Sequence, residues 1–340
     1  MTGFLTIDGV SKAFRPNLTL GEKIAARLGA EVETRPLRAV DAVSLSVAEG
    51  ETLGLVGESG CGKSTLGRIA AGILPPDSGT VTLDGQPVMQ SETKVTTRVQ
   101  TVFQDPFASL DPRMKVGDAV AEGPLAHGLT TRAGARDYVA DWFARVGFDP
   151  GLAERYPHQF SGGQRQRIAI ARALAMQPDL LICDEPVASL DVSIQAQILN
   201  LFLDLRRDLG LTCLFISHDL SVVRHVSDRM AVMYLGRIVE IGAAREVFDA
   251  PAHPYTAALL ASVPKLVVGD DELVTFKPIE GEIPSALSPP PGCHFAPRCP
   301  LAQAKCRDEV PALAPTGASA RRAACHFSSV QLEASRSVTA

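Results

Sequence analysis

Residues 57–65 of the chain read Gly57-Glu58-Ser59-Gly60-Cys61-Gly62-Lys63-Ser64-Thr65. This stretch fits the pattern G-x-x-x-x-G-K-[ST], in which glycines let backbone N–H groups surround the phosphates of a nucleotide. Lys63 is expected to reach the β- and γ-phosphates, and the Ser64 hydroxyl to bind Mg²⁺. A predicted buried strand at 52–56 precedes the loop and a predicted helix at 65–71 follows it, which is the geometry that phosphate binding requires. The sequence therefore predicts a nucleotide site rather than a glycine-rich turn.

A second polar stretch lies further along the chain and reads Ser161-Gly162-Gly163-Gln164-Arg165-Gln166-Arg167. Ser161 and Gln164 match the S-x-x-Q capping box of a helix N-terminus. A capped helix whose first amides point outward, followed by Arg165 and Arg167, is also an anion site. The stretch therefore predicts the start of a helix that can contact a phosphate.

Two apolar runs end in polar residues. The run 180–183 is followed by Asp184 and Glu185, and the run 211–217 is followed by His218. Alternating strands and helices around the phosphate loop predict a mostly parallel α/β sheet, and such sheets bind ligands at the carboxyl ends of their strands. Of two adjacent carboxylates, one that binds a metal is weakly basic, so its neighbour is left to accept a proton.

Together, the loop at 57–65 and the stretch at 161–167 resemble the ATP-binding cassette (ABC) family of ATPases. The resemblance implies a RecA-like P-loop core with an inserted helical subdomain. It also implies that the signature residues, 161–164, contact the γ-phosphate of ATP bound by a partner subunit. It assigns Asp184 to the Mg²⁺ shell, Glu185 to the attacking water, and His218 to the γ-phosphate. Without the resemblance, His218 would be interpreted as a structural histidine.

Weaker motifs extend the resemblance. Gln104 matches the glutamine that contacts the metal and the water and links the nucleotide to the membrane partner. Phe14, at the end of the first predicted strand, matches an aromatic residue, more often tyrosine, that stacks on adenine. Asp191 matches the D-loop, in which the usual order Ser-Ala is exchanged here, so Ser189 receives no role.

The resemblance thus implies an active site with three sets of residues. The catalytic residues are Glu185, His218 and Gln104, and the Mg²⁺ ligands are Ser64, Gln104 and Asp184. The ATP contacts are expected from Phe14 and from every residue of the loop 57–65.

Composition limits the function classes. The chain has 340 residues, of which 46% are hydrophobic, so it can bury one large core and a smaller appendage. No apolar run reaches the roughly 18 residues needed to cross a bilayer, and no signal peptide pattern occurs at the N-terminus, so we expect a cytosolic chain. A net charge of -5 argues against binding of nucleic acid or anionic lipid through a broad positively charged surface. Membrane association is then expected through protein partners.

The pattern along the chain predicts two units. We expect an ATPase domain at 1–250, with a helical subdomain inserted at about 105–165. A helix at 137–147 ends there at Gly147, with Trp142 and Phe143 in the subdomain core. A proline-rich extension is expected at 251–330 and a disordered tail at 331–340. An insertion at 15–39 contains a short amphipathic helix at 20–28, to which no role is assigned.

The cysteines fall into two groups. Cys61, Cys183 and Cys213 lie in predicted core elements, where a free cysteine behaves as a small hydrophobe. The other four crowd into the extension, and in a cytosolic protein such a cluster is more often a metal site than a disulfide framework. Their spacing is not C-x₂-C, which disfavours a zinc ribbon. These four are Cys293, Cys299, Cys306 and Cys325.

This cluster matches the cysteine extension of dipeptide and oligopeptide importer ATPases, in which four thiolates are linked to a [4Fe-4S] cluster. Zinc and metal-free thiols remain as alternatives, because ligand identity alone leaves the metal open. The chain as a whole resembles the second of the two ATPase subunits in that importer family. His253-Pro254-Tyr255-Thr256 is a further match to it, between core and extension.

The resemblance implies an ATPase that powers peptide import. Its implied partners are a homologous ATPase subunit in a heterodimer, two membrane permease subunits and, indirectly, an extracytoplasmic substrate-binding protein. The implied location is peripheral, on the cytoplasmic face of the inner membrane, with the permease contact near Gln104. Alternatives are an importer ATPase for nickel or another small solute, a redox-sensing regulator, and a soluble cassette ATPase acting on DNA or ribosomes. The single cassette, the acidic balance and the extension disfavour the last.

Overall fold

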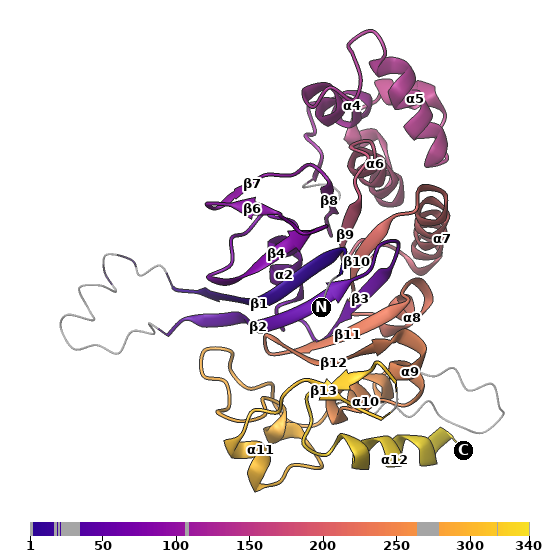
Figure 1. Ribbon diagram of the computed structural model, residues 1–340. Coiled ribbons are helices and arrows are strands. Elements are labelled where there is room, and N and C mark those ends of the chain that lie inside the picture. Colours follow the sequence, from indigo (N-terminus) through magenta and orange to yellow (C-terminus); the bar gives the residue numbers. More distant parts are fainter. Residues whose placement is uncertain are drawn as a thin grey trace, which may run out of the picture.

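The computed structural model in Figure 1 describes residues 3–16, 19, 21, 35–105, 109–263, 279–317 and 319–339. Two sequence-based expectations fall largely or partly outside these ranges. The short helix predicted at 20–28 has only residue 21 among the described residues, so it stays a prediction. The segment after Gln104 is described to residue 105 and again from residue 109.

Eight strands form the central sheet, in the order β13-β14-β12-β11-β3-β10-β9-β8. Five of them pair in parallel, namely β3 (Thr52–Val56), β8 (Val99–Val102), β9 (Leu180–Asp184), β10 (Thr212–Ile216) and β11 (Arg229–Tyr234). Every residue of β3, β9 and β10 is buried, which is typical of a parallel sheet covered on both faces. The predicted mostly parallel α/β core is confirmed.

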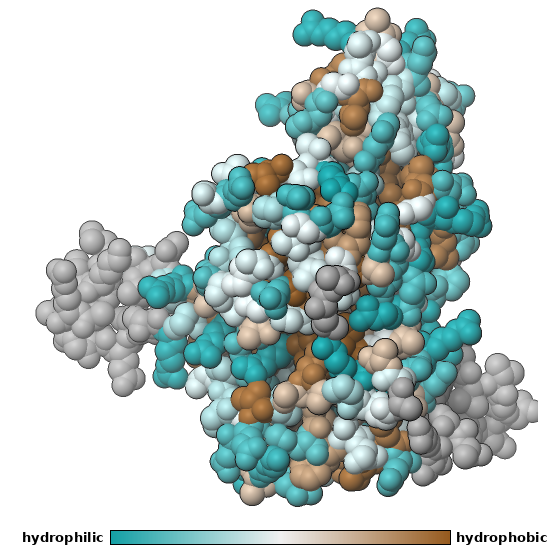
Figure 2. All heavy atoms as spheres, in the orientation of Figure 1, coloured by the Kyte–Doolittle hydropathy of each residue, from teal (hydrophilic) through white to brown (hydrophobic). Residues whose placement is uncertain are grey.

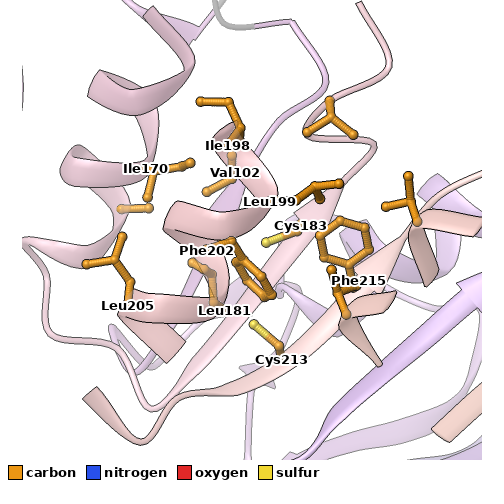
Figure 3. Packing of buried hydrophobic residues seen from close by; sticks show 14 of the residues in the cluster. Val102, Ile170, Leu181, Cys183, Ile198, Leu199, Phe202, Leu205, Cys213 and Phe215 are labelled. Carbon is orange, nitrogen blue, oxygen red and sulfur yellow. The ribbon is translucent and has the colours of Figure 1, made fainter. Parts of the chain in front are cut away.

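One face of this sheet packs against α6 (Gly162–Leu174) and α7 (Val192–Leu209). Figure 3 shows α7 side chains lying over β9 and β10, with the rings of Phe202 and Phe215 at 5.4 Å. Cys183 and Cys213 sit in the same cluster and are 2% and 0% exposed, so they serve as small hydrophobes as expected. This packing fixes the strands whose ends carry the polar residues of the site.

The other face packs against α2 (Lys63–Ala70) and a separate antiparallel sheet. That sheet has the order β2-β1-β4-β5, with β1 (Leu5–Phe14), β2 (Leu37–Val47), β4 (Ser78–Leu83) and β5 (Gln86–Pro87). A two-stranded ribbon, β6 (Met89–Gln90) with β7 (Thr93–Lys94), follows it. Leu66 and Ile69 of α2 are fully buried between the two sheets, which anchors the helix that leaves the phosphate loop.

The segment expected to be helical is helical where it is described. It contains α4 (Val116–Ala126), α5 (Ala135–Arg145) and the short 3₁₀ helices η1 (Pro150–Glu154) and η2 (Pro157–Gln159) before α6. Gly147, with φ 79°, follows the end of α5, as a glycine after a helix C-terminus does. Trp142 and Phe143 are 5% and 0% exposed, so they belong to the subdomain core as predicted. In Figure 1 this helical part projects from the sheet.

The C-terminal part of the chain joins the core sheet. Helix α8 (Leu220–Val226) precedes β11. After β12 (Arg237–Ala243) come α9 (Ala244–Asp249) and α10 (Pro254–Ala261), followed by η3 (Ala296–Arg298) and α11 (Ala304–Asp308). The short strand β14 (Arg322–Ala323) then pairs with β12, and β13 (Ala314–Pro315) pairs with β14. The described C-terminal residues therefore extend the central sheet beyond β12.

The end of the chain differs from the expectation. The tail predicted to be disordered from 331 lies within a helix, α12 (Ser328–Thr339). Leu332 is 8% exposed and packs with Ala252 and Ala323, and Gln331 is 9% exposed. This burial depends on tertiary contacts with the extension, and tertiary contacts can override local sequence preference. The polar composition of the tail therefore did not indicate a helix.

Candidate active site

Four neighbouring parallel strands end at one edge of the central sheet, and each is followed by predicted site residues. The phosphate loop follows β3 and His218 follows β10. Asp184 ends β9, Glu185 comes directly after it, and Gln104 follows β8. Carboxyl ends of parallel strands share an edge, so the fold brings these residues together. Figure 1 shows β3, β10, β9 and β8 side by side.

The phosphate loop depends on two glycines with positive φ, Gly57 (155°) and Gly62 (109°). A Cβ at Gly62 would collide with the carbonyl oxygen of Ala39, and one at Gly57 with that of Met233. Only glycine fits at such positions, so the loop can close tightly in front of the first turn of α2. The N-terminus of α2 lies within the loop, and a helix N-terminus favours an anion.

Lys63 opens α2 and is only 4% exposed. Its Nζ donates to the carbonyl oxygens of Gly57 at 2.8 Å and Glu58 at 3.0 Å. The ammonium group is therefore held inside the curve of the loop, beside the helix N-terminus, where a phosphate would be bound. Burial raises the pKa of the neighbouring Cys61 thiol, which is 5% exposed and stays protonated.

Ser64 and Asp184 form the candidate Mg²⁺ site. The Ser64 hydroxyl donates to Asp184 Oδ1 at 2.8 Å, and Asp184 is 6% exposed. Burial raises the pKa of Asp184, and the negative charge of Glu185 raises it further. A cation bound here would offset both the burial of the Asp184 charge and its repulsion by Glu185. Hydroxyl and carboxylate oxygens are ligands that Mg²⁺ takes, so Ser64 and Asp184 fit this ion.

Glu185 is the centre of a small polar network. Its Oε2 accepts from Gln104 Nε2 at 3.3 Å and lies 3.1 Å from His218 Nδ1. The backbone of Glu185 has φ 49°, an uncommon value for a residue with a side chain, and its amide donates to the Ile216 carbonyl at 2.9 Å. This turn aims the carboxylate toward His218 and Gln104 rather than along the strand, so the three predicted catalytic side chains meet.

The signature stretch forms the start of α6. Ser161 Oγ accepts from the Gln164 amide at 3.3 Å, and Gln164 Oε1 accepts from the Ser161 amide at 2.9 Å, so the predicted capping box is present. A Cβ at Gly163 would collide with the side chain of Ile194 near the start of α7, so close packing of the two helices requires this glycine.

The expected contribution of Arg165 to an anion site was wrong. Arg165 is 8% exposed, and its Nε donates to the Pro157 carbonyl at 2.7 Å. Arg167 donates to the Val146 carbonyl at 3.3 Å and to Gln197 Oε1 at 3.2 Å. Both guanidinium groups contact protein oxygens of the helical subdomain and α7, so any anion contact here falls to the helix start at 161–164.

Two weaker motif residues lie at the surface. Phe14 ends β1 opposite Leu37 of β2 and is 40% exposed, so its ring can stack on a planar ligand. Asp191 precedes α7 as its N-cap position, without a side-chain cap hydrogen bond, and it is exposed. Their roles in ATP binding and in the D-loop stay predictions.

The four cysteines of the extension line one pocket, together with apolar side chains, His253 and His326. Burial raises the pKa of Cys299 and of Cys325 to about 11, and the neighbouring cysteines raise the pKa of these two thiols further. Over the described ranges, no group of three or more His, Cys, Asp or Glu side chains is arranged to hold a metal ion. The thiols therefore share a pocket, with donors that suit iron–sulfur or zinc chemistry, but they do not form a closed ligand set.

Sequence reasoning missed two residues of the extension that contact the phosphate loop. The amide of Glu58 donates to Tyr255 Oη at 2.9 Å, and Arg298 forms an ion pair with the Glu58 carboxylate at 2.9 Å. Tyr255 belongs to the motif at 253–256, whereas nothing in the sequence marks Arg298.

Apolar surface occurs in small separate patches on the face shown in Figure 2. Within the part of the chain that the structure describes, no helix is long and apolar enough to cross a membrane.

Residues 40–188 match the family described as ABC transporter, and residues 239–306 match the one described as oligopeptide/dipeptide transporter, C-terminal region. The chain is 53% identical to a putative peptide import ATP-binding protein of Brucella abortus (strain 2308), over 86% of this chain and 87% of that protein. It is 49% identical to an oligopeptide transport ATP-binding protein of Bacillus subtilis (strain 168), over 86% and 90%. A similar solved structure is cbiO1 of Clostridium perfringens, part of the ABC transporter complex cbiONQ, with a TM-score of 0.59, 28% identity, and coverage of 73% of this chain and 91% of that one.

Proposed function

The chain belongs to the ABC transporter family of ATPases, in the branch of oligopeptide and dipeptide transporters, and from this premise we propose that it powers the import of peptides through a membrane permease. The observation that carries the peptide assignment is the C-terminal region at 239–306, which follows the ATP-binding core. Relatives named for peptide import at 53% and 49% identity support it.

In the proposed mechanism, Lys63 and the loop amides would bind the β- and γ-phosphates. Ser64, Asp184 and Gln104 would hold Mg²⁺, which would supply neutralisation of phosphate charge. Glu185 orients the attacking water and accepts its proton, because its carboxylate is not committed to the metal. His218 Nδ1 lies 3.1 Å from Glu185 Oε2, and this histidine would contact the γ-phosphate. Gln104 lies 3.3 Å from the same carboxylate. Occupation of the γ-phosphate site therefore affects Glu185, His218 and Gln104 together.

We propose that the site is completed in a heterodimer, in which the signature residues 161–164 contact ATP held by a homologous subunit. Two ATP molecules would then bridge facing loops and signatures, and hydrolysis would open the dimer and reset the permease. The capped start of α6, with Gly162 and Gly163 in its first turn, supports this contact.

Replacing Ser161 by arginine is expected to lower ATP hydrolysis of the assembled complex by about tenfold or more, because the bulky side chain blocks the partner's γ-phosphate. ATP binding by the isolated subunit should not change. Ser161→Thr, which retains the capping hydroxyl, is the matched control and should stay close to wild type. Full activity of the assembled Ser161→Arg complex would contradict the trans assignment.

The permease is proposed to dock in a groove beside Gln104, between the sheet and the helical subdomain. This groove, of about 350 Å³, is lined by Phe103, Gly123, Arg172 and Met176 among others. Phe103 is 38% exposed and directly precedes Gln104, so a docked segment would contact the residue next to the network. The chain would thus act at the cytoplasmic face of the inner membrane, with a substrate-binding protein reached only through the permease.

We further propose that Cys293, Cys299, Cys306 and Cys325 hold a [4Fe-4S] cluster that organises the extension, with zinc as the alternative metal. The shared pocket and its sulfur donors support this proposal. Ligand bonds would add folding energy to a segment with few regular elements.

Anaerobically purified protein is expected to contain about four irons and four sulfides per chain and to absorb near 400 nm, as Cys₄ ligation of such a cluster predicts. Cys299→Ser/Cys306→Ser should lose this iron and unfold at lower temperature. Cys213→Ala, which removes a buried thiol outside the pocket, should retain it. Colourless protein with one zinc, or unchanged metal content in the double variant, would overturn the assignment.

Uptake by a strain lacking the gene tests the solute class. Labelled dipeptides or oligopeptides should enter only when this chain is restored. Uptake of nickel but not peptides would favour the alternative importer. Unchanged uptake of every solute would favour a soluble ATPase acting on DNA or ribosomes, or a redox-sensing regulator.

A further inference from the structure

Glu58, the second residue of the phosphate loop, is held by the C-terminal extension through both its backbone and its side chain. Its amide donates to Tyr255 Oη at 2.9 Å. Its carboxylate accepts from Arg298 Nη1 at 2.9 Å and from Arg298 Nη2 at 3.2 Å. Two parallel bonds between a guanidinium and a carboxylate form the strongest and most directional ion pair that side chains make.

Arg298 is a fixed donor rather than a mobile surface charge. Its side chain is 3% exposed, compared with 22% for Glu58. Nε donates to the Glu280 carbonyl at 3.2 Å, and Nη2 donates to the Ile279 carbonyl at 3.4 Å. The extension thus orients the guanidinium before it meets the loop, so little conformational entropy is lost in the ion pair.

Tyr255 is fixed in the same way. It is 0% exposed, and its ring lies 4.5 Å from that of Tyr234 and 5.3 Å from that of Phe295. Burial raises its pKa far above the ordinary value, so the hydroxyl stays neutral. An aromatic cluster from β11, α10 and the extension therefore supports the oxygen that accepts the Glu58 amide.

The same residue of the loop also contacts Lys63, the lysine proposed to bind ATP. The Glu58 carbonyl accepts from Lys63 Nζ at 3.0 Å, so a shift of Glu58 displaces an acceptor of Lys63. Arg298 also directly precedes Cys299, and η3 lies between Cys293 and Cys299 of the cysteine pocket. The extension and the phosphate loop thus meet at Glu58.

We infer that Arg298 is a positioning residue for the ATP site, which presets the phosphate loop through Glu58, so that the C-terminal extension sets the affinity for ATP. The inference rests on the ATP binding in the proposed function and is independent of the solute.

The test measures the Kd for Mg-ATP by calorimetry on the full chain, with the nucleotide-free melting temperature as the folding control. Arg298→Gln should raise Kd by about tenfold, a change typical of one coupled ion pair. Arg298→Lys, which keeps the charge but loses the paired bonds, should fall between Arg298→Gln and wild type. In the assembled complex, KM for ATP should rise with little change in kcat.

A double-mutant cycle and a matched control separate positioning from general damage. Glu58→Gln should raise Kd like Arg298→Gln, and the double variant should bind no more weakly than either single variant. Arg321→Gln is the control, because Arg321 is a 6% exposed arginine of the extension that donates to the Glu246 carbonyl at 3.2 Å. It should lower the melting temperature without changing Kd.

The inference fails if wild type binds ATP and Arg298→Gln binds it equally well. It also fails if Arg321→Gln weakens binding as much as Arg298→Gln, or if the effects of Glu58→Gln and Arg298→Gln add in full. Should Arg298→Gln not fold, the Kd values of Arg298→Lys and Glu58→Gln are compared with that of the wild type instead. Kd values equal to that of the wild type would again contradict the inference. Loss of ATP binding in the wild type would instead overturn the proposed function.

Discussion

Glu185→Gln is expected to bind ATP like the wild type but to hydrolyse it about a hundredfold or more slowly, the range over which a general base contributes. The amide keeps the size of the side chain and can still meet Gln104 and His218, at 3.3 Å and 3.1 Å from the present carboxylate oxygen. It cannot take a proton from water. Because the phosphate and metal contacts are spared, the ATP-bound dimer should accumulate.

Phosphate release by the assembled complex and ATP-dependent dimerisation are the measurements. Glu51→Gln is a suitable control, since it removes a carboxylate that is 10% exposed and paired with Arg229 at 3.0 Å, away from the site. That control should hydrolyse ATP normally even if it melts earlier. Wild-type turnover by Glu185→Gln would remove Glu185 from the mechanism.

Lys63→Ala is expected to lose affinity for ATP by about a hundredfold, because hydrogen bonds to a charged group each contribute about 1.5 to 3 kcal/mol. The change also leaves the Gly57 and Glu58 carbonyls, now at 2.8 Å and 3.0 Å from Nζ, without that donor. The loop should therefore lose both its charge and part of its order. Calorimetric titration with Mg-ATP measures the effect.

Lys94→Ala is the matched control for Lys63→Ala. Lys94 also donates from Nζ to a backbone carbonyl, that of Val99 at 2.6 Å, but it lies outside the phosphate loop. ATP affinity should be unchanged in this variant. ATP binding by Lys63→Ala at the wild-type level would argue against the loop as the phosphate site.

Local patterns allowed most of the site to be predicted from the sequence. The loop glycines, the buried strands and the polar residues directly after them are encoded by neighbours in the chain, and parallel pairing then brings the strand ends together. The capping box also involves residues that are close in sequence, Ser161 and Gln164, and the structure contains it.

Contacts between distant segments could not be predicted. Arg298 and Glu58 are 240 residues apart in sequence, and an arginine beside a cysteine carries no signal for an ion pair with the phosphate loop. Strand β14, which pairs with β12, has only two residues, and no strand pattern in the sequence marks it. Arg165 resembled an anion ligand by its neighbours, yet tertiary packing turned it to the Pro157 carbonyl. The burial of Leu332 in the C-terminal helix likewise depends on contacts with the extension, which the sequence of the tail does not indicate.

ATP-driven peptide uptake tests the central claim most directly. A strain lacking the gene is supplied with the wild-type chain or with Glu185→Gln, and entry of a labelled dipeptide and a labelled oligopeptide is measured. The wild-type chain should restore uptake of at least one of them, and Glu185→Gln should leave it at the level of the deletion strain. Peptide uptake that is unaffected by the deletion, or restored equally by Glu185→Gln, would contradict the account.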